Sequence, residues 1–77
     1  MAKMRVKLWY EGELIHEPII SRLANEFGIV ANIRRANVED DTGWIVTELE
    51  GEESQLTKAT DWLTQIGVSI EPVAELE

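Results

Sequence analysis

Residues 29–50 read IVANIRRANVEDDTGWIVTELE, and this stretch decides the fold. Both of its ends are rich in β-branched residues, and the DDTG cluster at 40–43 between them is typical of a turn. The sequence therefore predicts an antiparallel hairpin with strands over residues 29–38 and 44–50. Polar side chains occur in both phases of the first of these strands, which indicates an edge strand.

A helix is predicted on each side of this hairpin, because apolar residues recur at every third and fourth position there. Pro18 suits the first position of the earlier helix, where no amide donor is needed, and Gly28 suits the left-handed cap at its end. The later helix is predicted over residues 53–66, with Gly67 beyond its end.

Two outer strands complete the pattern. Residues 4–10 alternate between apolar and polar side chains, as a half-buried strand does, and residues 68–73 predict a short edge strand that contains Pro72. The resulting βαββαβ order is that of a ferredoxin-like α+β sandwich. Right-handed crossovers give a four-stranded antiparallel sheet in the order 4-1-3-2, with both helices on one face.

The 77 residues are too few for a second domain, so we expect one domain, residues 1–77, with a core over about residues 4–73. The sheet face away from the helices is predicted to carry Trp9, Trp44 and Val46 beside charged residues. Because tryptophan is enriched at protein contacts, these three residues are a candidate interface. A tryptophan that only covers the margin of the sheet is the alternative reading.

The net charge of −8 is unevenly placed, with +2 on residues 1–35 and −10 on residues 36–77. Such an acidic chain disfavours phosphate backbones and anionic lipids, so we expect no nucleic-acid partner. No apolar run approaches the ~20 residues that span a bilayer, and we expect a cytoplasmic protein. Arg34 and Arg35 are adjacent, so in a regular strand they point to opposite faces, where each pairs with a nearby carboxylate.

Residues for catalysis or metal binding are scarce. The chain has no cysteine and one histidine, His16, which leaves too few soft ligands for a zinc or iron–sulfur site. Ser21 and Ser54 have no histidine partner in a recognisable pattern, and the glycines form no phosphate-binding loop. We therefore expect no enzyme activity, no metal and no cofactor.

Three segments in order, EPIISRL at 17–23, VANI at 30–33 and GWIVTELEG at 43–51, resemble the NIL domain, a relative of the ACT-like ligand-binding modules. The resemblance implies a ferredoxin-like fold. In this family the domain lies at the C-terminus of the ATPase subunit of methionine ABC importers, where it binds methionine and regulates transport, and at the N-terminus of some ferredoxin-type proteins. Arg34, where the family's Asn-Ile-Leu stretch has leucine, and a shorter hairpin depart from the importer members.

The resemblance favours a freestanding regulatory domain that senses methionine or a related amino acid. The candidate ligand residues lie near the loop before the first helix and in the second strand: Ile15, His16, Pro18, Asn32 and Ile33. Apolar surface with a few polar groups suits an amino acid, although each residue also fits an ordinary capping or edge-strand role.

The alternative function is a ligand-free module that docks on a transport protein or a ferredoxin-type electron-transfer partner. A homodimer is expected in either case, because so short a chain buries a marginal core. Both the open face of the sheet and the edge of the second strand are available for pairing about a twofold axis.

Overall fold

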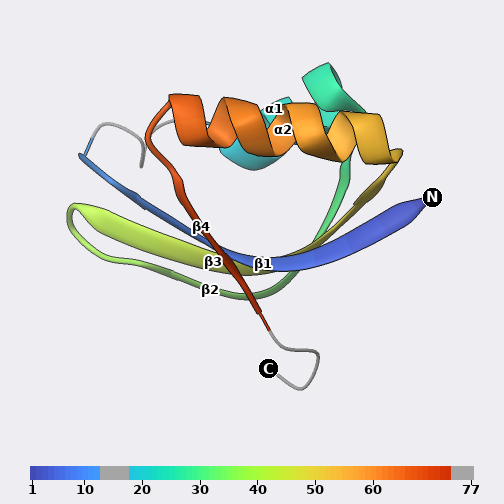
Figure 1. The fold of residues 1–77 in the computed structure, drawn as a ribbon. Coiled ribbons are helices and arrows are strands. Elements are labelled where there is room, and N and C mark those ends of the chain that lie inside the picture. Colours follow the sequence, from blue (N-terminus) through green and yellow to red (C-terminus); the bar gives the residue numbers. More distant parts are fainter. Residues whose placement is uncertain (13–17, 74–77) are drawn as a thin grey trace.

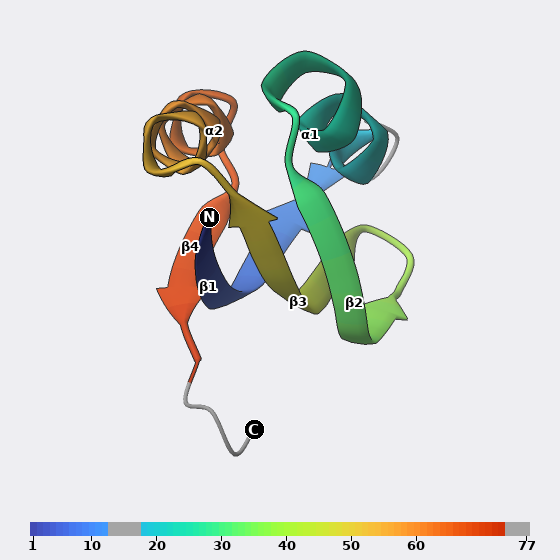
Figure 2. The ribbon, with the colours of Figure 1, turned by 90° about the vertical axis from the view of Figure 1, so that its right-hand side faces the viewer.

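The computed structural model describes residues 1–12 and 18–73. Its elements are β1 (Ala2–Glu11), α1 (Ile19–Phe27), β2 (Val30–Val38), β3 (Thr42–Gly51), α2 (Glu53–Gln65) and β4 (Ser69–Pro72). The four strands form one antiparallel sheet in the order β2-β3-β1-β4, which is the predicted order read from its other edge. Both helices lie over the same face of this sheet (Figure 1) and run side by side above it (Figure 2). The ferredoxin-like prediction is confirmed.

β1 is one of the two central strands of the sheet. It pairs with β3 along its whole length, from Ala2 opposite Gly51 to Glu11 opposite Thr42. Its other side pairs with the four residues of β4, which include Pro72 on the outer edge as predicted. β2 is the opposite edge strand and pairs only with β3 within the described sheet.

The core lies between the sheet and the helices. Every second residue of β1 faces the helices, and Val6 and Leu8 on this side are fully buried. Leu23 of α1 and Leu63 of α2 close over them and are also completely buried. Burial of each such side chain contributes about 1.5–3 kcal/mol. The helices also touch each other, where the Phe27 and Trp62 rings lie 5.4 Å apart.

The helix ends follow the sequence closely, with two small differences. Gly28 and Gly67 have positive φ angles of 66° and 101°, as a left-handed helix end requires. Pro18 precedes the first helical residue instead of occupying it, and its carbonyl accepts a hydrogen bond from the Arg22 amide at 2.9 Å. α2 ends at Gln65, one residue earlier than predicted.

A β-bulge explains the polar residues in both phases of β2. Ile33 pairs with Thr47 and Arg35 with Val46, so Arg34 is the extra residue that shifts the alternation. The prediction that Arg34 and Arg35 point to opposite faces is therefore wrong, because both belong to the face away from the helices. The predicted carboxylate partner is confirmed for Arg34, whose Nη2 lies 3.8 Å from Glu48 Oε1.

Candidate functional site

A small apolar pocket opens at the start of α1, between this helix and the sheet. Its volume is about 190 Å³. It is lined by Tyr10, Pro18, Ile19, Ile20, Ser21 and Ile45. The end of β1 and the start of β3 thus supply its floor, while the first turn of α1 supplies one wall.

The polar groups near this pocket include the Tyr10 and Ser21 hydroxyl groups and the first backbone amides of α1. The first amides of a helix have no acceptor within the helix, and among the described residues the N-cap residue Pro18 offers no side-chain hydrogen bond to them. The described first turn of α1 contains no acidic residue, and the positive end of a helix dipole favours a negatively charged group. The pocket therefore combines apolar walls with amide donors, which suits a carboxylate attached to an apolar group.

Gly43 gives the pocket its shape. It lies opposite Tyr10 in the β1–β3 pairing, and a Cβ atom at this position would be 2.9 Å from Tyr10 Cε2. The absence of a side chain at Gly43 thus lets the Tyr10 ring lie across β3. The sequence predicts only a turn at Gly43 and does not indicate Tyr10, Ile19 or Ile45 as pocket residues.

The predicted ligand residues are distributed over both faces of the sheet. Pro18 lines the pocket, whereas Ile33 lies one strand further out on the helix side and is half-exposed. Asn32 lies on the other face, where its Nδ2 donates a hydrogen bond to Glu50 Oε2 at 3.3 Å. Ile15 and His16 lie outside the described residues. A single chain therefore does not bring Pro18 and Asn32 together.

The sheet face away from the helices, called the open face below, carries the three predicted interface residues. Trp9 and Trp44 are directly opposite each other on β1 and β3, with ring centroids 6.4 Å apart. The Lys7 ammonium lies 4.2 Å from the Trp9 centroid and 4.4 Å from that of Trp44. Val46 shares the face but is only 3% exposed, so the exposed apolar surface here comes from the indoles.

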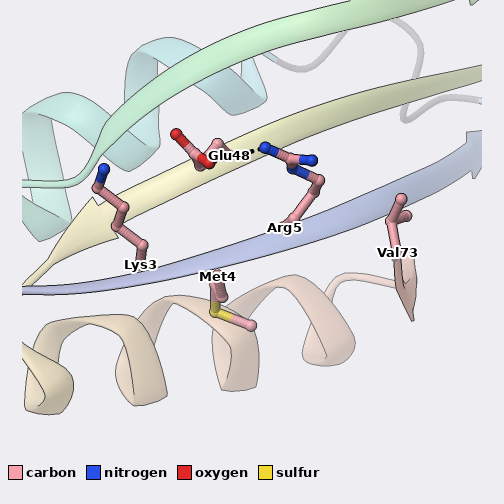
Figure 3. Close-up of a pocket in the computed structure, with 5 residues that line it drawn as sticks. All are labelled: Lys3, Met4, Arg5, Glu48 and Val73. Carbon is pink, nitrogen blue, oxygen red and sulfur yellow. Dashed lines mark hydrogen bonds and ion pairs between the residues drawn. The ribbon is translucent and has the colours of Figure 1, made fainter. Parts of the chain in front are cut away.

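An ion-pair network lies further along the open face. Arg5 of β1 reaches across to Glu48 of β3 beside a hollow of about 350 Å³ (Figure 3), and its Nη2 donates to Glu48 Oε2 at 3.1 Å. This hydrogen bond, assisted by the charges of Lys3 and Arg34, lowers the pKa of Glu48 below its usual value. The Glu48 carboxylate therefore stays ionised and paired with these cations. Because these charges are already paired with one another, the hollow is a poor candidate for a catalytic site.

The edge of β2 is the third surface of interest. Three of the large apolar side chains with high exposure lie on it, Val30, Ile33 and Val38, each more than half exposed. An edge strand with apolar side chains and free backbone groups is a template for pairing with another strand.

The described residues contain no group of three or more His, Cys, Asp and Glu side chains placed to hold a metal ion. Neither of the two helices in this part of the chain is long and apolar enough to cross a membrane.

In a comparison with protein families, the NIL domain model matches residues 4–72. Among curated proteins, the L-aspartate semialdehyde sulfurtransferase iron-sulfur subunit of Methanocaldococcus jannaschii is 32% identical over 65 residues. The match covers 84% of this chain and 50% of that protein.

Methionine import ATP-binding proteins form the other group of relatives. MetN of Helicobacter pylori strain J99 is 29% identical over 73 residues, which cover 90% of this chain and 22% of MetN. MetN 2 of Oenococcus oeni is 32% identical over 74 residues, covering 91% of this chain and 21% of the relative. The chain thus spans half or less of these curated relatives.

A solved structure has the same fold. The C-terminal domain of an ABC transporter ATP-binding protein from Enterococcus faecalis superposes with a TM-score of 0.80 at 26% identity. The superposition covers 94% of this chain and 84% of that domain.

Proposed function

Because this chain belongs to the NIL domain family, we propose that it is a regulatory module that senses methionine or a related amino acid. The family match spans nearly all of the chain, and several relatives are methionine import ATP-binding proteins. In this proposal the domain has no catalytic activity of its own and acts by changing the behaviour of the protein to which it belongs or binds.

The observation that carries the proposal is the pocket at the start of α1. Its volume of about 190 Å³ is below the ~300–1,000 Å³ of clefts for drug-sized ligands, and it suits one amino acid. The ligand carboxylate accepts hydrogen bonds from the first amides of α1, while its side chain contacts Ile19 and Ile45. Ile15, His16 and Ile33 remain candidate contacts, whereas Asn32, on the open face, is not part of this pocket.

Calorimetric titration with L-methionine tests this proposal. We expect saturable one-site binding in the millimolar range or tighter, with norleucine binding because its side chain has a similar shape. Methionine methyl ester lacks the carboxylate and should bind at least about tenfold more weakly, since it cannot accept charge-assisted hydrogen bonds from the helix. A flat titration with methionine up to about 1 mM, where binding is worth only ~4 kcal/mol, would contradict the proposal.

A pair of matched variants locates the binding site. Ser21→Glu places a carboxylate in the first turn of α1, where it competes with the ligand for the amides and for the dipole. Ser54→Glu makes the same change in the first turn of α2, at an equally exposed residue away from the pocket. Only Ser21→Glu should weaken methionine binding; equal weakening by both variants would exclude this pocket.

The proposed module is a homodimer, and the exposed edge of β2 is its proposed contact. Pairing of two β2 strands about a twofold axis covers Val30, Ile33 and Val38 and satisfies free backbone groups. Sedimentation at micromolar concentration should give twice the 8.8 kDa of one chain. Ile33→Lys should produce monomers while Trp44→Ala does not; the reverse result would assign the dimer to Trp9, Trp44 and Val46 on the open face.

A protein-interaction module is the second candidate function. The similarity to an iron-sulfur subunit of which this chain covers one half favours it, since the remainder of that relative is a natural neighbour for such a domain. Under this alternative the partner is a ferredoxin-type or transport protein and no amino acid binds. The calorimetric titration separates the two candidates.

A further inference from the structure

The cations of this acidic chain are concentrated on the open face. Strand pairing and alternation place five of its seven basic residues there: Lys3, Arg5, Lys7, Arg34 and Arg35. The same face carries four acidic residues: Glu11, Glu48, Glu50 and Glu71. The described residues of the open face therefore carry a net charge of +1, in a chain whose net charge is −8. Among the described surfaces, this face is thus the one that repels an acidic protein least.

The carboxylates of the open face already have intramolecular partners. Glu48 accepts from Arg5 at 3.1 Å, and Glu50 lies 4.0 Å from the Lys3 ammonium. Glu71 accepts from the Trp9 indole N–H at 3.4 Å. These contacts reduce the ability of Glu48, Glu50 and Glu71 to repel an acidic partner, because each of these three carboxylates has a donor beside it.

Lys7 differs from Lys3, Arg5 and Arg34, which form ion pairs on this face. Its ammonium rests on the Trp9 and Trp44 rings, and within the described residues no carboxylate oxygen lies within 4.0 Å of it. Trp9 is 42% exposed beside it. A cation held between two indoles is a preformed anchor, since the rings fix its position and exclude water when a partner covers them.

We propose that the open face is the docking surface for an acidic protein, with a partner carboxylate on Lys7 and apolar contact on Trp9 and Trp44. The proposal rests on the interaction alternative above, and of the two partner classes named there it takes the iron–sulfur protein of the ferredoxin type. It does not depend on amino-acid binding, because the pocket at the start of α1 lies on the other side of the sheet.

The three tryptophans allow a direct test by NMR. Each indole N–H gives its own signal, and Trp62 lies between the helices as an internal control. Titration of the ¹⁵N-labelled chain with a small acidic ferredoxin should shift the Trp9 and Trp44 signals and leave Trp62 unmoved. The apparent affinity should fall as salt is raised, because the attraction is electrostatic.

Two charge reversals serve as matched variants. Lys7→Glu and Lys58→Glu lower the net charge equally, but Lys58 lies exposed on α2. We expect Lys7→Glu to weaken ferredoxin binding at least about tenfold and Lys58→Glu to change it less than about twofold. Thermal melting of both variants checks that each is folded, and Lys7→Gln should give an intermediate loss.

Three results would overturn the assignment: no indole shift at millimolar ferredoxin, equal weakening by the two reversals, or a shift confined to Trp62. The last result would leave an interaction function in place on another surface. A methionine titration of the same sample reports on the amides of Ile20 and Ser21, so failure of the sensing proposal is visible separately.

Discussion

The two faces of the sheet are built from the same strands but differ in what fills them. On the helix side, Val6, Leu8 and Leu49 are fully buried against α1 and α2. On the open face, Lys7 and Trp9 alternate with Val6 and Leu8 along β1 and remain partly accessible. Successive side chains of a strand point to opposite faces. Neighbouring residues of β1 therefore have different roles: one stabilises the core, and the next is available for contact with a partner.

The largest expected effect contrasts two adjacent residues of β1. Leu8→Ala removes a side chain with 0% exposure and should lower the free energy of unfolding by about 2–5 kcal/mol. Lys7→Ala, on the opposite face, removes only an accessible cation–π contact worth ~0.5–1 kcal/mol. Urea denaturation of both variants measures the difference. Equal losses would mean that the open face also holds the fold together.

A smaller loss of stability is expected from a substitution at Gly43, beside the pocket residue Tyr10. Gly43→Ala places a methyl group 2.9 Å from Tyr10 Cε2, and displacement of the ring should cost about 1–3 kcal/mol. The same substitution in a Tyr10→Leu background should cost clearly less, because the clash is with the ring. A loss independent of Tyr10 would indicate a backbone effect and remove the proposed reason for glycine at this position.

The smallest effect concerns the ion pair on the open face. The Arg5 guanidinium lowers the pKa of Glu48 in the folded state, so ionised Glu48 stabilises the fold above its ordinary pKa. This contribution disappears as the pH falls through the lowered folded pKa. Glu48→Gln should therefore be less stable than the native chain near neutral pH, and the gap should close between about pH 5 and pH 2. A gap that stays constant with pH would exclude the ion pair as its source.

Much of the fold could be predicted, because the spacing of the apolar residues and the positions of the glycines and prolines indicate the same elements. The alternation in β1, the helical spacing of Leu56 and Leu63, and the glycines at 28 and 67 each point to the same architecture. The bulge at Arg34 could not be predicted. An inserted residue places polar side chains in both phases of the strand, and a regular edge strand has the same pattern.

The candidate sites were less accessible to sequence reasoning. Trp9 and Trp44 were correctly placed on one face, since alternation alone decides this. The Lys7 contact with both rings and the Tyr10 pocket depend on the register between β1 and β3, which a single sequence does not specify. The pairing of Tyr10 with Gly43 shows the signal in retrospect: a glycine opposite an aromatic residue leaves room for the ring.

We propose that the helix side of the sheet binds an amino acid and that the open face does not. The most direct test is an amide NMR titration of the ¹⁵N-labelled chain with L-methionine. We expect shifts of the Ile19, Ile20 and Ser21 amide signals, with the Trp9 and Trp44 indole signals unmoved. Shifts of the two indoles without any change at the start of α1 would contradict this proposal.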